Sequence, residues 1–529
     1  MLEFDSTIHV PVLLLTALLV WLGVKLFGRR KRHSMRSVAI LVLGDIGRSP
    51  RMMYHAQSFA ENGFVTDLIG YAGSKPIPSL GRLPKVRIRH IPELPKMFRF
   101  LPYLVIAPIK VIHQTISILL CLLVWIDVPP EFIIVQNPPS IPTLALVQLV
   151  ARTRGSKVII DWHNLGYSIL ALRLGNDHIL VRVAKWFEST FGYSAYAHLF
   201  VSRAMRDFLV KEWHLQGHKA ILYDRPPRHF HRSSAQETHE LFCKLHPKLM
   251  LDERLRKFLP TASIPYSTIL THTARPSASA AFIDSDIDAT YIEIEMPTLR
   301  PDRPAILVSS TSWTPDEDFS ILLDALVLYE KRATRICAES NKEGADKYLP
   351  KLLVIITGKG PLKEKYMNEI AGLEKDWNWV RCISLWLEPR DYPILLGSSD
   401  LGVCLHSSSS SLDLPMKVID MFGCGLPVCA IGYNCLPELV KDGKNGLIFN
   451  SSQELASQLE TVFLSFPNSS YLASLTQALS NREQQPSTPN TAHMPAVPRA
   501  AEDVEEPWCT WEENWGRIVR PLILNDVNL

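Results

Sequence analysis

The sequence lacks a strong net charge, paired cysteines and a dinucleotide-binding fingerprint. Its 56 basic and 53 acidic residues leave a formal charge of +3, which argues against nucleic acid as the main partner. Nine cysteines, an odd number with no CxxC pair among them, indicate a reducing compartment rather than a disulfide framework. The glycine-containing loop at 44–56 does not have the GxGxxG spacing, so the sequence does not support binding of a dinucleotide.

A long apolar run lies near the beginning of the sequence. Residues 10–27, VPVLLLTALLVWLGVKLF, are about as long as a bilayer core requires, and the basic segment GRRKRHSMR follows them directly. A cleaved secretory signal has its positive charges before the apolar run, whereas here they come after it. We therefore predict a retained transmembrane anchor with a basic flank at 1–36, and a cytosolic location for the remaining chain.

A second apolar stretch, at 100–126, is also long enough to cross a membrane, although two prolines, a lysine and a histidine interrupt it. The strand candidates 37–44 and 132–137 lie on either side of it in the sequence. A single sheet cannot straddle a bilayer, so a crossing here would separate strands that belong together. We expect the stretch to lie in the membrane interface, with a buried helix as the alternative.

The rest of the chain alternates apolar, β-branched segments with helical ones, which predicts parallel sheets covered by helices. We expect Rossmann-like α/β domains at 37–224 and 304–482 that face each other across a cleft. Segments rich in Ser, Thr, Ala and Pro predict a flexible insertion at 225–303 and a disordered linker at 483–507. A final helix is predicted at 508–529. Its apolar stripe consists of Trp508, Trp511, Trp515 and Ile518.

Two loops of the first domain carry candidate site residues, because ligands of open parallel sheets bind at the carboxyl ends of strands. The loop at 44–56, GDIGRSPRMMYHA, places Arg48 and Arg51 just before a helix, which suits an anion cradle. The loop at 161–168, DWHNLGYS, places His163 between Trp162 and Asn164. A lone histidine in such a loop is often a satisfied structural residue, and that alternative stays open.

Glycine and a cation also occur together after a strand of the second domain. The segment TGKGP at 357–361 places Lys359 between Gly358 and Gly360, where the backbone can approach a ligand closely. Such a segment suits a phosphate contact, and an ordinary structural turn is the alternative.

The stretch SSSSSLDLPMKVIDMFGCGLPV at 407–428 predicts a loop that closes on a helix starting near Leu414. On that helix Asp413, Lys417 and Asp420 have the spacing i, i+4 and i+7, which brings them to one face. A helix N-terminus with a lysine one turn in attracts phosphate, and a solvated helix face is the alternative. Together the loops of both domains predict a phosphate ester as the ligand.

Longer segments resemble those of the chitobiosyldiphosphodolichol β-mannosyltransferases. They include VLGDIGRSPRMMYHA, EFIIVQNPPSIP, KVIIDWHNLGYSI, VIITGKGPLKEKY, ELVKDGKNGLIF and the stretch at 407–428. The resemblance covers nearly the whole chain apart from the insertion and the linker. It implies a GT-B fold that holds the donor mainly in the C-terminal domain and the acceptor in the N-terminal one. It also implies mannose transfer from GDP-mannose to dolichol-diphosphate-linked chitobiose, at the cytosolic face of the endoplasmic reticulum membrane.

The resemblance implies roles for individual residues. Donor-binding candidates are Gly358, Lys359, Gly360, Asp413, Lys417, Asp420 and Glu438. Acceptor-binding candidates are Arg48, Arg51, Trp162 and Asn164. Within these sets Lys359 and Lys417 are expected at the donor diphosphate, and Glu438 at the ribose. Trp162 would offer the acceptor sugar a stacking surface.

The chain also departs from the pattern that it resembles. Ser411 stands where the family usually has glycine, and a positive φ there would strain the turn by roughly 1 kcal/mol. The segment SSTSWTPDEDF is acidic where related enzymes often have an Arg/Lys pair. The diphosphate must then be held otherwise, or by a cation shared with Glu317 and Asp318. The sequence itself predicts no metal ligands and requires no cofactor, and a role for Mg²⁺ is left open.

Formation of a β-mannoside from an α-linked donor inverts the anomeric centre, which implies one in-line displacement assisted by a base near the acceptor 4-hydroxyl. His163 and Asp45 are the candidate bases, because both lie in loops that follow strands. Two alternatives remain. One is a membrane-tethered GT-B transferase with another nucleotide sugar or lipid acceptor. The other is a non-catalytic scaffold for dolichol-linked intermediates and other mannosyltransferases of the pathway.

Overall fold

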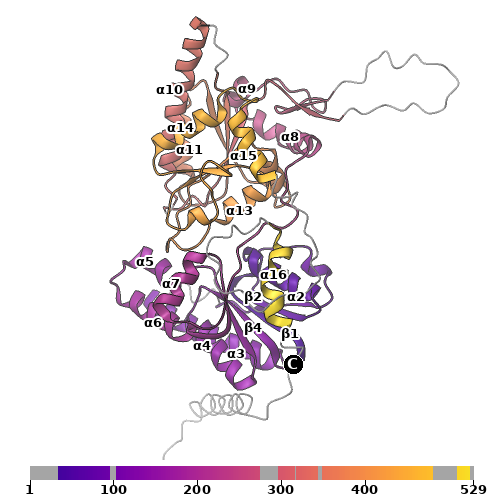
Figure 1. The fold of residues 1–529 in the computed structure, drawn as a ribbon, viewed down its shortest axis with the longest axis vertical. Helices are drawn as coiled ribbons and strands as arrows, with labels where there is room; N and C mark the ends of the chain where they lie inside the picture. The colour runs from indigo at the N-terminus through magenta and orange to yellow at the C-terminus, as the bar shows by residue number, and fades with distance from the viewer. Residues whose placement is uncertain are drawn as a thin grey trace, which may run out of the picture. The chain divides into compact units, whose positions relative to one another are not determined.

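The computed structural model describes residues 34–95, 103–273, 296–315, 317–343, 348–480 and 509–524. The chain divides into two compact units (Figure 1). Unit 1 comprises Met1–Asp224 and Glu512–Leu529, and unit 2 comprises Arg225–Trp511. The predicted apolar anchor and the predicted linker at 483–507 lie outside the described residues.

Unit 1 is built on a seven-stranded sheet in the order β3-β2-β1-β4-β5-β6-β7, whose strand pairs are all parallel. The strands are β1 (Ser34–Asp45), β2 (Val65–Tyr71), β3 (Val86–Ile91), β4 (Pro130–Asn137), β5 (Lys157–Trp162), β6 (Ser194–Phe200) and β7 (Gln216–Ile221). The central strands are buried apolar runs such as FIIV at 132–135, as expected of a sheet covered on both faces. Strand order reverses between β1 and β4, so the loops after these strands flank a topological switch point.

Seven described α-helices pack in unit 1. They are α2 (Pro50–Glu61), α3 (Tyr103–Leu120), α4 (Thr143–Arg154), α5 (Gly166–Leu174), α6 (Ile179–Gly192), α7 (Arg203–Trp213) and α16 (Trp511–Leu524). Figure 1 shows α16, in yellow, beside α2, and the Trp515 ring meets Phe59 of α2 edge-on with centroids 5.1 Å apart. The buried stripe of α16 consists of Trp511, Trp515, Val519 and Ile523. It therefore differs from the predicted stripe, since Ile518 is half-buried and Trp508 lies outside the described residues.

The second apolar stretch forms α3, followed by a π-helical turn at Cys121–Trp125. Within the described residues, Ile106–Trp125 is the one helical span long and apolar enough to cross a membrane, judged by length and composition, and 33% of it is buried. The helix packs against α4 and buries Ile118 and Leu122, while Ile112 and Ile116 are exposed. One side of this helix is thus part of the core of unit 1.

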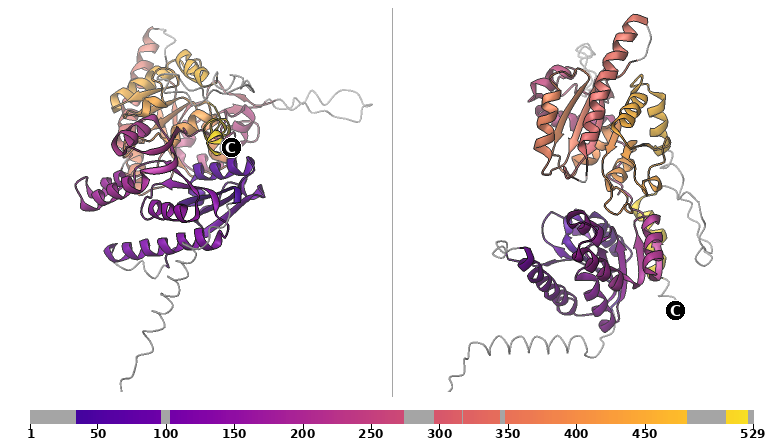
Figure 2. Two further views of the ribbon diagram at one scale, coloured as in Figure 1. Left: turned by 60° about the horizontal axis from the view of Figure 1, so that its bottom comes forward. Right: turned by 90° about the vertical axis from the view of Figure 1, so that its left-hand side faces the viewer.

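Unit 2 contains a six-stranded parallel sheet in the order β12-β11-β10-β13-β14-β15. The strands are β10 (Ala305–Ser310), β11 (Leu352–Thr357), β12 (Val380–Leu385), β13 (Leu401–Cys404), β14 (Val428–Ile431) and β15 (Gly446–Phe449). The helices that follow them are α10 (Phe319–Glu343), α11 (Lys363–Leu373), α12 (Asp391–Ser398), α13 (Met416–Gly423), α14 (Ser452–Phe463) and α15 (Ser470–Ser480). Figure 2 shows α10 lying along this sheet, and the strand order reverses between β10 and β13.

The predicted flexible insertion at 225–303 contains regular structure, so the prediction is wrong for part of that range. It holds α8 (Ala235–Met250), α9 (Glu253–Phe258) and a short antiparallel pair of β8 (Thr271–His272) with β9 (Thr298–Leu299). A capping box of Ser234 and Glu237 begins α8, and Lys244 of α8 lies 2.6 Å from Asp391 of α12. Residues 274–295 lie outside the described part of the chain.

The helix expected near Leu414 begins two residues later, because Pro415 is its N-cap residue and α13 starts at Met416. Asp413 therefore precedes the helix and does not share a helical face with Lys417, which corrects the predicted i, i+4, i+7 arrangement. Ser411 has a φ of 58°, in the left-handed region that favours glycine. The condition under which strain was expected at Ser411 is thus met.

Candidate active site

His163 follows β5, and its side chain turns back onto the carboxylate of Asp161 in that strand. Side chains two residues apart in a strand share one face, so the D-x-H spacing brings the two together. His163 Nε2 lies 2.8 Å from Asp161 Oδ2, and the backbone N–H of His163 donates to the carbonyl oxygen of Asn137 at 2.9 Å. Asp161 is fully buried, whereas the His163 side chain keeps 22% of its surface exposed.

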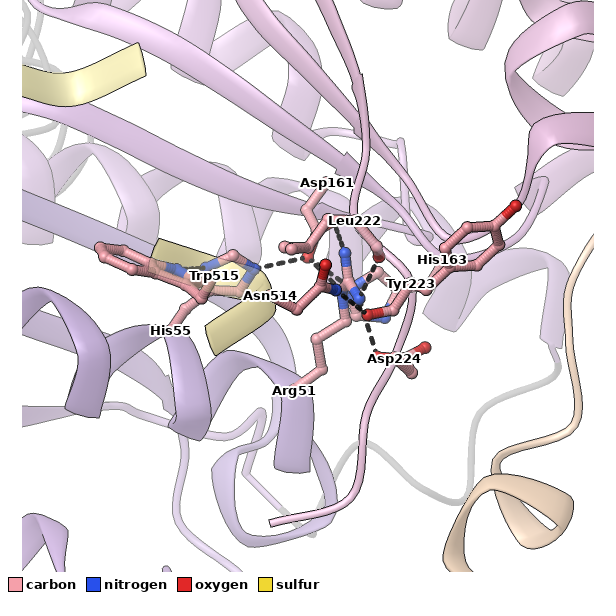
Figure 3. Close-up of polar contacts among 9 residues, drawn as sticks. All are labelled: Arg51, His55, Asp161, His163, Leu222, Tyr223, Asp224, Asn514 and Trp515. Atoms are coloured by element: carbon pink, nitrogen blue, oxygen red, sulfur yellow. Dashed lines mark hydrogen bonds and ion pairs between the residues drawn. The ribbon is translucent and has the colours of Figure 1, made fainter. Parts of the chain in front are cut away.

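Asp161 lies within a buried ion-pair network (Figure 3). Arg51 of α2 donates two hydrogen bonds to it, from Nε to Oδ2 and from Nη2 to Oδ1, both 2.8 Å long. Arg51 Nη1 also donates to Asp224 Oδ1 and to the carbonyl oxygen of Leu222, each at 2.8 Å. Burial alone would raise the pKa of Asp161, but the charge of Arg51 and the bond from His163 hold it well below its usual value.

This network corrects the role predicted for Arg51. The side chain is only 3% exposed, and two carboxylates and a carbonyl group already engage it. Burial alone would lower the pKa of Arg51, but Asp161 and Asp224 raise it, so the guanidinium stays charged. Arg51 therefore holds Asp161 in place and does not offer an anion cradle to a ligand.

The network also determines which nitrogen of His163 carries a proton. Because Asp161 is ionised, its oxygens can only accept hydrogen bonds, so the Nε2 atom of His163 must donate. In neutral His163 the remaining nitrogen, Nδ1, then has the free lone pair. A neutral histidine held in this tautomer can accept a proton at Nδ1, as a general base does.

Trp162, expected to stack on a sugar, has no exposed surface. It points to the other side of β5, where its Nε1 donates to His198 Nδ1 at 3.2 Å and its ring meets Trp213 edge-on. Asn164 shapes the loop, since its Oδ1 accepts from the N–H of Leu165 at 2.7 Å. Trp162 is therefore a core residue in this structure, which is a correction of the predicted stacking role.

Asp45 organises the loop after β1. Its Oδ1 accepts from the N–H of Gly47 at 3.0 Å, and both carboxylate oxygens accept from the N–H of Ser74, at 3.0 and 2.8 Å. Burial raises the pKa of Asp45, but these donors and nearby Arg48 outweigh it, so the pKa lies below its usual value. A carboxylate so strongly held is a weak base. The Arg48 side chain is 81% exposed, with its Nε atom 3.5 Å from Asp45 Oδ2.

In unit 2, Glu317 gathers the polar groups at the switch point between β10 and β13. It is only 3% exposed, and its Oε2 accepts from Thr311 Oγ1 at 2.5 Å and from the N–H of Ser312 at 2.7 Å. Its Oε1 forms an ion pair with Lys417 Nζ of α13 and lies 3.8 Å from His406 Nδ1. The lysine predicted at the donor diphosphate is thus held by a buried carboxylate.

Gly358 and Gly360 let the TGKGP loop lie against the segment that follows β10. A Cβ atom on Gly358 would be 1.8 Å from the Thr311 carbonyl oxygen, and one on Gly360 equally close to that of Ser312. Gly358 also has a φ of 129°, which side chains rarely permit. Lys359 between them is exposed, with its Nζ 3.8 Å from the ring centre of Trp386. The two glycines therefore have a packing role that the sequence did not reveal.

The other donor candidates take different positions. Asp413 accepts hydrogen bonds from Ser408 Oγ and from Ser410 Oγ, and burial raises its pKa against those bonds. Its carboxyl group is therefore engaged by the serine loop. Asp420 lies on α13 one turn beyond Lys417, and Glu438 ends the 3₁₀ turn Leu436–Glu438 after β14. In the described part of the chain, no three His, Cys, Asp or Glu side chains are arranged to hold a metal ion.

Two solved structures share the fold of this chain at low sequence identity. One is a sucrose-phosphate synthase from Thermosynechococcus elongatus, with a TM-score of 0.54 and 10% identity, covering 85% of this chain and 94% of that one. The other is WaaG, a glycosyltransferase involved in lipopolysaccharide biosynthesis, with a TM-score of 0.51, 11% identity and coverages of 85% and 96%. The family model of group 1 glycosyl transferases matches residues 327–464. Two Rossmann-like parallel sheets with this match define a GT-B glycosyltransferase.

Curated relatives are similar over much more of the sequence. The chitobiosyldiphosphodolichol beta-mannosyltransferase of Pongo abelii is 39% identical over 97% of this chain and 99% of its own length, and the Homo sapiens protein of that name gives the same values. UDP-glycosyltransferase TURAN of Arabidopsis thaliana is 43% identical over 81% of this chain and 89% of its own length. The chain belongs to the chitobiosyldiphosphodolichol beta-mannosyltransferase family, and it is a hexosyltransferase.

Proposed function

We propose that the chain transfers mannose from GDP-mannose to the terminal GlcNAc of GlcNAc₂-diphosphodolichol, with inversion, and forms a β-1,4 linkage. The product is the first mannosylated form of the dolichol-linked N-glycan precursor. The observation that carries this proposal is the 39% identity, over 97% of the chain, with relatives named chitobiosyldiphosphodolichol beta-mannosyltransferase.

In the proposed reaction, His163 Nδ1 accepts the proton of the acceptor 4-hydroxyl as the sugar oxygen attacks the anomeric carbon. Buried, ionised Asp161 stabilises the imidazolium that forms and keeps the ring oriented. Asp45 is the second candidate base, and the N–H groups that already occupy its carboxylate make it the less reactive one. We propose that exposed Arg48 binds the acceptor diphosphate. Asn164 is proposed to shape the loop beside the acceptor.

On the donor side, we propose that Lys417 and Lys359 stabilise the negative charge of the departing GDP. Lys417 lies in the first turn of α13, where N–H groups without helical partners and the positive end of the helix dipole add to its charge. Glu317 would keep Lys417 in an ion pair until the donor diphosphate competes for the lysine. Asp420 and Glu438 are proposed contacts to the sugar and the ribose.

We further propose that residues 1–36 anchor the protein in the endoplasmic reticulum membrane with both units on the cytosolic side. In this arrangement α3 lies in the membrane interface. Support comes from the exposed apolar side chains of Ile112, Ile116 and Trp125, on a helix whose other side is buried in unit 1.

The experiment that tests the proposed function offers different donors to membranes that carry the full chain. The acceptor is a synthetic GlcNAc₂-diphosphate lipid, and the donors are radiolabelled GDP-mannose and, separately, UDP-glucose. We expect transfer from GDP-mannose, and release of the label by a β-mannosidase but not by an α-mannosidase. Release by the α-mannosidase would contradict the inverting mechanism. Folded protein that transfers from neither donor would favour the non-catalytic scaffold.

A UDP-sugar transferase is the second candidate function. The observation in its favour is the 43% identity with a relative whose name gives UDP-glycosyltransferase. The same experiment separates the two candidates, because transfer from UDP-glucose in place of GDP-mannose would select this one.

A further inference from the structure

We propose that Trp515 of the C-terminal helix α16 positions His163 through His55 and Asp161. The inference rests on the role of His163 as the base of the proposed function. It assigns a part in acceptor activation to a helix that follows all of unit 2 in the sequence.

The proposed connection is a chain of hydrogen bonds (Figure 3). Trp515 Nε1 donates to His55 Nδ1 at 3.1 Å, and His55 Nε2 lies 3.2 Å from Asp161 Oδ2. The same oxygen of Asp161 lies 2.8 Å from His163 Nε2. Trp515 is 1% exposed, and both His55 and Asp161 are fully buried, so water does not compete for these bonds.

The chemistry of the indole and of the ionised Asp161 carboxylate sets the direction of the bonds in this chain. An indole N–H can only donate, so the Nδ1 atom of His55 must accept, and neutral His55 then carries its proton on Nε2. Burial lowers the pKa of His55 despite its bond to Asp161, which favours that neutral form. His55 therefore donates to Asp161, and Asp161 in turn accepts from His163. Ionised Asp161 also requires a donor at His55 Nε2, so loss of the indole would leave this tautomer in place but remove the contact that holds the His55 ring in its orientation.

A second bond ties α16 to the same network. Asn514 Nδ2 donates to the carbonyl oxygen of Tyr223 at 2.8 Å. Arg51 donates to both sequence neighbours of Tyr223, which are Leu222 and Asp224. Arg51 also donates to Asp161. The helix thus contacts His55, one donor to the Asp161 carboxylate, and also bonds to the chain segment that holds the other donor, Arg51.

The test compares Trp515→Phe with Val519→Ala in the full-length enzyme. Phenylalanine keeps a ring against Phe59 but removes the donor, whereas Val519→Ala removes fully buried packing from the same helix and no polar contact. We expect Trp515→Phe to lower kcat about tenfold with both KM values unchanged, because an outer hydrogen bond acts through the orientation of the base. Val519→Ala should lower the Tm and keep kcat.

A double-mutant cycle with His55→Leu tests whether the effect passes through His55. Trp515→Phe should add almost nothing to the loss caused by His55→Leu, and His55→Gln, which can both accept and donate, should keep most of the turnover. Fully multiplicative losses, or equal losses of kcat in Trp515→Phe and Val519→Ala, would overturn the proposal.

His163→Ala is measured in parallel, so that a failure of this inference can be told from a failure of the proposed function. Wild-type turnover of Trp515→Phe beside an inactive His163→Ala would overturn the positioning role alone. Wild-type turnover of His163→Ala would remove the assignment of the base, and the positioning role with it.

Discussion

The two candidate bases differ in how much of their hydrogen-bonding capacity is already used. His163 has one nitrogen bound to Asp161 and the other free to accept a proton, whereas the Asp45 carboxylate accepts from the N–H groups of Gly47 and Ser74. We expect His163→Ala to lower kcat by about 100-fold or more, the usual contribution of a general base, while the variant still binds GDP. Mannosyl transfer and GDP binding are the two measurements.

Asp45→Asn serves as the comparison. An asparagine oxygen can still accept from Gly47 and Ser74, so this variant should lose less than tenfold in kcat. The assignment would pass to Asp45 if His163→Ala turned over normally while Asp45→Asn bound GDP without transferring mannose.

Lys417 forms an ion pair with the buried carboxylate of Glu317. Replacing the lysine tests whether it does more than neutralise that carboxylate. We expect Lys417→Ala to lower kcat/KM at least tenfold, which is about 1.4 kcal/mol of transition-state stabilisation, because the leaving diphosphate loses a cation. Lys375→Ala is the control, since this exposed lysine precedes the edge strand β12, whereas Lys417 follows the central strand β13. An unchanged kcat/KM in folded Lys417→Ala would leave the lysine with a structural role only.

Ser411 provides a test of backbone strain. A side chain in the left-handed region destabilises the folded state by about 1–2 kcal/mol. Glycine removes this strain, but its greater backbone freedom stabilises the unfolded state by roughly 0.5–1 kcal/mol. Since Ser411 has a φ of 58°, Ser411→Gly should raise the free energy of unfolding by about 0.5–1 kcal/mol in urea denaturation. Ser407→Gly, in the same loop but without a positive φ, should not stabilise the protein. Equal effects of both variants would refute strain at Ser411.

At the level of elements, the TGKGP loop and the segment after β10 fit together only because two residues lack side chains. Gly358→Ala would place a Cβ atom 1.8 Å from the Thr311 carbonyl oxygen, so one of the two loops must move. We expect at least a tenfold rise in the Kd for GDP, measured by calorimetry, because Thr311 and Ser312 also hold Glu317. Gly372→Ala in α11 is the matched control, because its Cβ meets nothing within 4 Å and alanine favours the helix. Normal GDP binding by Gly358→Ala would show that this loop does not contribute to the donor site.

The sequence predicted the strands more closely than the site. The strand candidate at 132–137 lies within β4 and ends at the same residue, because a short apolar, β-branched run has few alternatives in a parallel sheet. The start of α13 was predicted two residues early, since Asp413 binds serines of its own loop instead of capping the helix. The contacts of Arg51 with Asp161 and of Trp515 with His55 join residues far apart in the chain, and no local pattern reports such contacts.

At the level of the whole molecule, both sheets reverse their strand order at the first strand, and each carries a buried polar cluster at the carboxyl ends of its strands. The proposed membrane topology places both units on the cytosolic side. A glycosylation tag inserted after Ser480, the exposed last residue of α15, should remain unmodified, because cytosolic segments do not meet the lumenal glycosylation machinery. A tag placed before residue 10 is the control and should be modified. Modification at Ser480 would contradict the cytosolic assignment.

The membership of α16 in unit 1 has a consequence for the order of events on the ribosome. Unit 1 supplies the first sheet to be synthesised, but Trp515, which packs on Phe59 and donates to His55, is added only after all of unit 2. During synthesis the nascent first unit therefore has an apolar surface of α2 uncovered and lacks the indole donor of Trp515 at His55. A premature stop codon just before α16 would leave every strand of both sheets in place, yet it would release a polypeptide that quality-control chaperones can recognise as unfinished.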